Sequence, residues 1–123
     1  DKAIQFIRKA YKRDPTDMYA VFQLARAVTQ KGNTGEAEKL YHEVARVMPE
    51  YSTLYYEIGR LKANQGKQGI SNFYLAKYYL YEGKIRYAKQ YLHRAATDRT
   101  VPPAMQDEAR TILARLKQLE ESM

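Results

Sequence analysis

With 123 residues, of which 45% are apolar, the chain is long enough for one domain with a buried core. It has no cysteine, which excludes disulfide bonds and thiolate metal sites, and no apolar run approaches the roughly 20 residues of a membrane-spanning helix. Six glycines, four prolines and a lack of apolar and polar alternation favour helices over a sheet.

The net charge of +7 is concentrated in the middle of the chain. Residues 60–99 hold nine Lys or Arg against two acids, whereas residues 1–59 hold nine against eight and residues 100–123 three against four. A basic stretch attracts anionic partners such as an acidic peptide, a nucleic acid or a membrane surface. A solvated helix surface is the simpler interpretation of the same stretch, so the charge leaves the partner open.

The first expected element is a helix over residues 1–13, in which Ala3, Ile7 and Ala10 precede Pro15. This layout matches the second helix of a two-helix repeat whose first helix is missing. We therefore expect the native protein to continue upstream, and this helix to expose an apolar face that would normally be covered.

The next four expected helices, over residues 17–31, 34–48, 51–65 and 69–82, follow an internal repeat with a period of 34 residues. Glycine is expected in the left-handed conformation that ends a first helix, and proline is expected to end a second helix. The matching positions pair Ala3 with Ala37, Pro15 with Pro49, Leu24 with Ile58, Ala25 with Gly59, Arg26 with Arg60, and Gly32 with Gly66.

The repeat then takes a half step, because Gly83 follows Gly66 by only 17 residues. The helix over residues 69–82 is therefore expected to close one repeat and to open the next, which continues in a helix over residues 84–97. A last helix over residues 102–121 begins at Pro102 and Pro103, since proline is tolerated in a first turn. Its apolar stripe predicts a cap; the stripe comprises Met105, Ala109, Ile112, Leu113, Leu116 and Leu119.

The repeat resembles the tetratricopeptide (TPR) family through Val21, Leu24-Ala25, Val28, Ala37, Tyr41 and Pro49, followed by Tyr55, Ile58-Gly59 and Gly66. The resemblance implies an all-α, right-handed superhelical solenoid of about seven antiparallel helices with a C-terminal capping helix. It divides a single domain into the second helix of a truncated repeat (1–15), repeats at 17–50 and 51–82, an overlapping degenerate repeat at 69–98, and the cap at 102–121.

The second half of the chain also resembles the C-terminal TPR region of bacterial HExxH zinc metalloproteases of the beta-barrel assembly-enhancing type. The residues that carry this resemblance are Gly66-Lys67, Tyr74-Leu75-Ala76-Lys77-Tyr78-Tyr79, Gly83-Lys84, Ala88, Leu92, and the segment 109–116. The resemblance implies a periplasmic location beside a protease domain and a role in outer-membrane assembly; the residues themselves leave a cytoplasmic location open.

A catalytic centre is not expected in this chain. The nearest approach to HExxH is the run from His42 to Arg46, and arginine offers no lone pair to a metal. His42 and His93 stand apart from other ligand residues, and Gly66-Lys67-Gln68-Gly69 lacks the spacing of a phosphate-binding loop. We therefore expect no enzyme activity, no metal and no cofactor, with catalysis, if any, in an upstream domain.

Function is expected in a groove lined by the first helix of each pair, where Arg26, Arg60 and Lys77 occupy equivalent positions and form a basic ladder with flanking aromatics. About half of the groove tyrosines are expected to be partly buried. The expected groove residues are Tyr19, Phe22, Gln23, Arg26 and Gln30; Thr53, Tyr56, Glu57, Arg60 and Asn64; and Ile70, Phe73, Tyr74, Lys77 and Tyr81.

This groove predicts a peptide or protein ligand of acidic and apolar character. Phe22 and Glu57 stand where the carboxylate clamp of chaperone-binding TPR domains needs polar or basic groups, so a chaperone tail is not the expected ligand. Two alternatives stay open. Tyrosines that alternate with Lys77, Lys84, Arg86 and Lys89 suggest single-stranded nucleic acid, or the module scaffolds its own protease domain.

Overall fold

The computed structural model describes residues 2–14 and 16–123, and this part of the chain is entirely helical, with no strand. Every described helix boundary lies within one residue of its expected position, which confirms the all-α class. The described helices are α1 (Lys2–Arg13), α2 (Met18–Gln30), α3 (Thr34–Val47), α4 (Ser52–Asn64), α5 (Gln68–Tyr81), α6 (Ile85–Thr97) and α7 (Pro103–Glu121).

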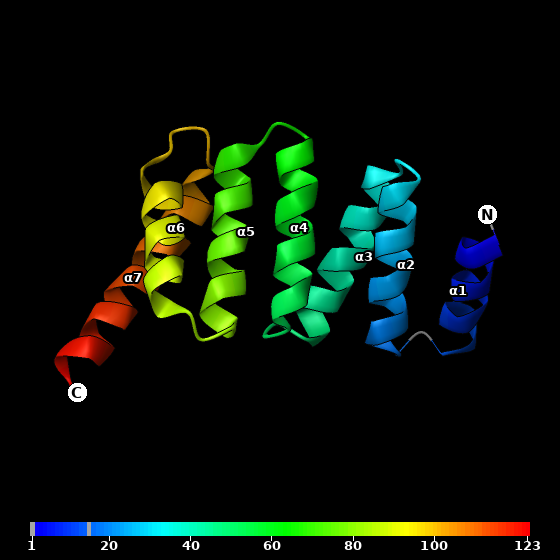
Figure 1. Cartoon of the computed structure of the whole chain (residues 1–123), viewed down its shortest axis with the longest axis horizontal. Helices are drawn as coiled ribbons and strands as arrows, with labels where there is room; N and C mark the ends of the chain where they lie inside the picture. Colours follow the sequence, from blue (N-terminus) through cyan, green and yellow to red (C-terminus); the bar gives the residue numbers. More distant parts are fainter. Residues whose placement is uncertain (1, 15) are drawn as a thin grey trace.

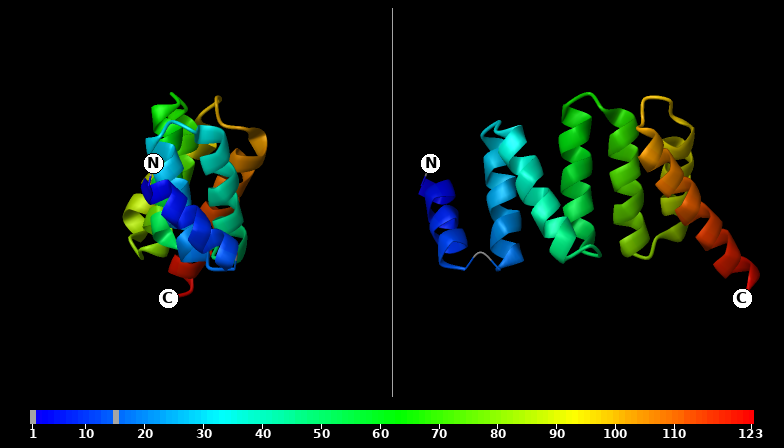
Figure 2. Two further views of the ribbon diagram at one scale, coloured as in Figure 1. Left: turned by 90° about the vertical axis from the view of Figure 1, so that its right-hand side faces the viewer. Right: turned by 180° about the vertical axis from the view of Figure 1, so that it is seen from behind.

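Figure 1 shows the helices side by side in a row, with α1 and α7 at opposite ends. Each helix packs against the next one in the chain, and α2 also contacts α4. In the two views of Figure 2, α3 and α7 lie on one side of the row and α6 lies on the other. Because almost all packing is between neighbours in sequence, each helix pair depends on the pairs beside it for burial.

Glycine ends three of the helices as left-handed residues. Gly32, Gly66 and Gly83 have φ of 84°, 76° and 77°. The residue after each glycine donates its N–H to a carbonyl five residues earlier, as Asn33 does to Val28 at 3.0 Å. The expected conformation at Gly32 and Gly66 is thereby confirmed. Pro49 follows the last residue of α3 by two positions, whereas Pro15 lies outside the described residues.

The core runs along the row between the helices. Small residues occupy the positions where neighbouring helices cross, and Ala25, Ala37 and Ala76 are fully buried there. Leu24 and Ile58, one period apart, are 1% and 3% exposed, as the apolar pattern predicts. Each such side chain contributes roughly 1.5–3 kcal/mol through its removal from water.

Ser71 joins α4 to α5 at their closest approach. Its hydroxyl is buried and donates a hydrogen bond to the carbonyl of Gly59 at 2.8 Å. A Cβ at Gly59 would lie 3.1 Å from the Leu75 side chain. A residue with no side chain therefore allows α5 to approach α4 this closely.

Ion pairs link helices that are adjacent in the chain or separated by one helix. Lys62 of α4 lies 2.9 Å from Glu38 of α3, and the side chain of Gln65 donates to the same carboxylate at 3.0 Å. These hydrogen bonds, with Lys62 the larger cause, lower the pKa of Glu38. Arg8 of α1 pairs with Glu36 of α3 at 2.6 Å, in addition to the packing of α1 against α2.

Gly69 and Gly35 provide a matched test of packing, since each is the second residue of its helix and they lie one period apart. A Cβ at Gly69 would lie 2.8 Å from Val101 and 2.9 Å from Asp98 Cγ, whereas nothing lies within 4 Å of one at Gly35. We predict that Gly69→Ala lowers the free energy of unfolding by about 1–3 kcal/mol. Gly35→Ala should leave it unchanged or raise it by up to about 1 kcal/mol. Urea denaturation followed by circular dichroism measures both, and equal effects would contradict the packing described at Gly69.

Tyr55 should make the stability pH-dependent in alkaline solution. Its ring is 5% exposed and its hydroxyl donates to the carbonyl of Pro49 at 2.5 Å. Burial raises the pKa of Tyr55 to about 12. Because the unfolded pKa is about 10, stability from this group is complete below pH 10 and is lost as pH rises toward 12, by roughly 2–3 kcal/mol.

Tyr55→Phe removes both the hydrogen bond and the titration. We predict that the variant is less stable than wild type by about 1 kcal/mol at pH 7. The difference should shrink or change sign near pH 12. Urea titrations at several pH values test this, and a constant difference from pH 7 to pH 12 would contradict it.

Candidate functional site

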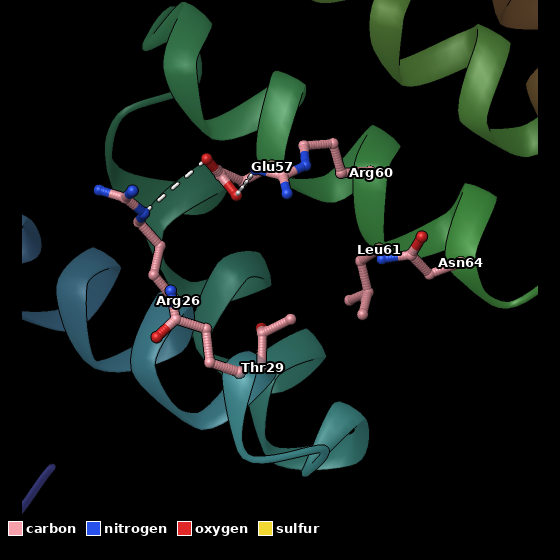
Figure 3. A pocket seen from close by; sticks show the side chains of 7 residues that line it. Arg26, Thr29, Glu57, Arg60, Leu61 and Asn64 are labelled. Atoms are coloured by element: carbon pink, nitrogen blue, oxygen red, sulfur yellow. Dashed lines mark ion pairs between the residues drawn. The ribbon is translucent and has the colours of Figure 1, made fainter.

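Two arginines from neighbouring helices converge on one glutamate. Arg26 Nε of α2 lies 3.8 Å from Glu57 Oε1 of α4, and Arg60 Nη1, one turn after Glu57, lies 3.9 Å from Glu57 Oε2. Figure 3 shows the carboxylate between the two guanidinium groups. The arginine side chains are 43% and 60% exposed, and that of Glu57 is 15% exposed. The cluster thus carries one net positive charge at the surface.

A small pocket of about 70 Å³ opens beside this cluster. This volume is well below the roughly 300–1,000 Å³ of small-ligand sites, so the pocket takes a small group such as a carboxylate but not a large side chain. Polar groups dominate its wall, with Leu61 as the apolar exception. The lining residues are Arg26, Thr29, Gln30, Glu57, Arg60, Leu61 and Asn64 (Figure 3).

Aromatic rings support the two arginines. The Arg60 guanidinium lies 5.9 Å from the centre of the Tyr56 ring, and the Arg26 guanidinium lies 5.9 Å from that of Phe22. Contacts of this type at exposed sites contribute about 0.5–1 kcal/mol and orient the cation. Tyr56 is 40% exposed, and Tyr19, on the same face of α2 as Arg26, is 62% exposed. Gln23 is also exposed on that face.

Three expected groove residues belong to the core instead. Phe22, Phe73 and Tyr74 are only 1%, 2% and 9% exposed, so their side chains are not accessible to a ligand. Phe22 packs against Tyr51 and Tyr41, with ring centres 5.2 Å and 5.9 Å apart, and these contacts cover its ring. Burial also raises the pKa of Tyr74.

The expected ladder of three cations is divided between two places. Lys77 Nζ of α5 lies 2.7 Å from Glu108 of α7, 5.0 Å from the centre of the Phe73 ring and 5.5 Å from that of Tyr55. Tyr81 stacks on Tyr55 with centres 5.6 Å apart. Arg60 instead lies beside Tyr56, which follows Tyr55 on α4 and faces another side of the helix. Arg60 and Lys77 therefore do not share a groove.

Lys77 and Tyr81 line a second, larger pocket between α5 and α7. Its volume is about 390 Å³, within the range of small-ligand sites. Its wall combines apolar side chains with charged groups at the rim. The lining residues are Lys77, Leu80, Tyr81, Glu108, Thr111, Ile112, Arg115 and Leu116.

The two pockets are lined by residues at equivalent positions of the repeat. Each of the seven residues of the first pocket has a counterpart in the second pocket 51 residues later, which is one and a half periods. The ion pair is repeated as well, because Arg26 with Glu57 corresponds to Lys77 with Glu108. The remaining pairs are Thr29 with Leu80, Gln30 with Tyr81, Arg60 with Thr111, Leu61 with Ile112, and Asn64 with Arg115.

The two pockets lie between different helix pairs. The first pocket lies between α2 and α4, and α3 packs against both of these helices. The second lies between α5 and α7, and α6 packs against both. α3 and α6 themselves lie on opposite sides of the row (Figure 2).

The residues of α7 are the functional candidates that the sequence analysis missed. Glu108, Thr111, Ile112 and Arg115 were expected only as parts of a capping helix, and their role as one wall of a pocket was not predicted. A comparison at an offset of 51 residues aligns Glu108 with Glu57 and Ile112 with Leu61, and it would have found them.

The stretch that suggested nucleic-acid binding is partly engaged within the chain. Lys77 pairs with Glu108 and Lys89 pairs with Glu120, whereas Lys84 and Arg86 have no ion pair among the described residues. Its tyrosines stack largely on one another, as Tyr79 does on Tyr91 at 5.3 Å. Fewer cations and ring faces are therefore available to a nucleic acid than the sequence suggested.

Comparison with protein-family models and with curated proteins finds no match to this chain. Within residues 2–14 and 16–123 no group of three or more His, Asp or Glu side chains is placed to hold a metal ion. Among the described helices, none combines the length and the apolar character needed to cross a membrane.

Proposed function

We propose that this chain is a non-catalytic TPR-type module that binds a peptide or protein segment of acidic and apolar character. The observation that carries the proposal is the convergence of half-exposed Arg26 and Arg60 on the single carboxylate of Glu57 beside a small pocket. The uncompensated positive charge attracts a carboxylate. The neighbouring Tyr19 and Tyr56 offer exposed ring surface to an apolar side chain.

A right-handed solenoid of TPR repeats is part of this proposal. Three observations support it: each helix packs on its neighbour in sequence, left-handed glycines end α2 and α4 one period apart, and equivalent residues line both pockets. Repeats of this kind present extended surfaces to their ligands.

The resemblance to the metalloproteases adds a proposed context. In it, the module belongs to a larger periplasmic zinc protease, and its ligand is a component or substrate of outer-membrane assembly. The support is the set of residues from Gly66 to Leu116 quoted above. The full-length reading frame tests this part: a signal peptide and an upstream HExxH are expected, and a frame without them would contradict it.

The ligand class is testable with the peptide acetyl-Leu-Asp-Phe-Glu-Leu-Asp-amide and two relatives. One relative replaces the acids by lysine, and the other replaces the apolar residues by glycine and serine. We predict that only the first peptide binds well, and that raising the salt concentration weakens its binding because the arginines are half-exposed. Fluorescence anisotropy of labelled peptides measures each affinity.

Arg60→Glu tests the site itself. It should weaken binding at the first pocket roughly ten- to a hundredfold, equivalent to about 1.4–2.8 kcal/mol, because the reversed charge repels the ligand carboxylate. Arg46→Glu makes the same change in net charge at an exposed position of α3 and should leave the affinity unchanged. Equal weakening by both variants would reduce the effect to overall charge and overturn the proposed site.

A further inference from the structure

The second pocket, between α5 and α7, repeats the charge balance of the first with a different wall. In the first pocket, Arg26 and Arg60 share Glu57. In the second, Glu108 is paired with Lys77, and Arg115 has no ion pair within the described part of the chain. Each pocket therefore carries two cations, one carboxylate and one net positive charge.

The walls differ in size and polarity. Thr29 and Gln30 of the first pocket are replaced at the equivalent positions by Leu80 and Tyr81. The volume rises from about 70 to about 390 Å³. The larger space, bounded also by Ile112 and Leu116, suits a bulky apolar side chain, which gains affinity through removal from water.

We propose that this pocket is a second binding site, which takes a bulky apolar side chain flanked by a carboxylate. Leu80, Ile112 and Leu116 contact the apolar group, and Arg115 attracts the carboxylate at the rim. Lys77 already pairs with Glu108 at 2.7 Å, and the Lys77 side chain is 19% exposed. Arg115 is therefore the cation of this pocket whose charge is not neutralised by a partner.

The consequence is a module with two ligands. The two pockets share no lining residue and lie between different helix pairs, α2 with α4 and α5 with α7. One chain thus holds two acidic and apolar segments at once, one in each pocket, and joins two partners or two segments of one partner. The inference rests on the peptide-binding role proposed above and adds an independent site to it.

Calorimetric stoichiometry of the full chain with the acetyl-Leu-Asp-Phe-Glu-Leu-Asp-amide peptide tests this proposal. We expect two peptides per wild-type chain. Arg115→Glu should weaken the second site at least tenfold and leave one peptide per chain at the concentrations used. Arg60→Glu should also leave one, through loss of the other site. Arg99→Glu, an exposed position in the α6–α7 loop, makes the same charge change as a control and should retain two.

The possible results separate the two proposals. One peptide per wild-type chain, lost in Arg60→Glu and unaffected by Arg115→Glu, overturns the second site and leaves the first. Weakening in Arg115→Glu with none in Arg60→Glu overturns the first site and supports the second. Binding of two peptides that neither variant weakens, or an equal affinity for the lysine-containing peptide, overturns the charge recognition proposed for both. Circular dichroism confirms that each exposed variant remains folded.

Discussion

The close approach of α4 and α5 is the constraint on which the arrangement of the other helices depends. At Gly59 a Cβ would lie 3.1 Å from the Leu75 side chain, a tight contact, and the Ser71 hydroxyl donates to the carbonyl of Gly59 within the interface. α5 packs in turn against α6 on another face. α5 is therefore the second helix of one pair and the first helix of the next. This double use corresponds to the 17-residue step between Gly66 and Gly83 in the sequence.

The double use of α5 determines where the charged residues of the two pockets lie. Equivalent cations, Arg26 and Lys77, each pair with a glutamate 31 residues later, on the helix two places further along the row. The first contact is long and half-exposed, and such surface pairs contribute only about 0–1 kcal/mol to stability. A ligand carboxylate can therefore compete with Glu57 for Arg26 at little energetic cost. The tighter Lys77 pair leaves that role to Arg115 in the second pocket.

Local sequence patterns predicted where the helices begin and end, but not all of the side chains that each helix buries. Gly32 and Gly66 act through interactions within a few residues. Together with the 34-residue period, they predicted every described helix boundary to within one residue. Helical spacing also placed Arg26, Glu57 and Arg60 in one groove, although their ion pairs were not predicted.

The incorrect predictions concern the burial of three side chains and the direction in which one face of α5 points. Phe22, Phe73 and Tyr74 are buried by side chains of neighbouring helices, and their depth depends on tertiary packing that local patterns do not contain. Lys77 was assigned to the same groove as Arg60 because a repeat at constant step keeps equivalent residues on one side. The half step instead turns the face of α5 that carries Lys77 toward α7, and this rotation depends on tertiary packing.

Intermolecular nuclear Overhauser effects between the chain and the methyl groups of the Leu-Asp-Phe-Glu-Leu-Asp peptide would test the central claim most directly, namely that repeat-related pockets bind acidic and apolar segments. The account predicts contacts from peptide methyl groups to the exposed Tyr56 ring beside the first pocket and to Ile112 in the wall of the second. Contacts confined to other surfaces, with none to either residue, would contradict it.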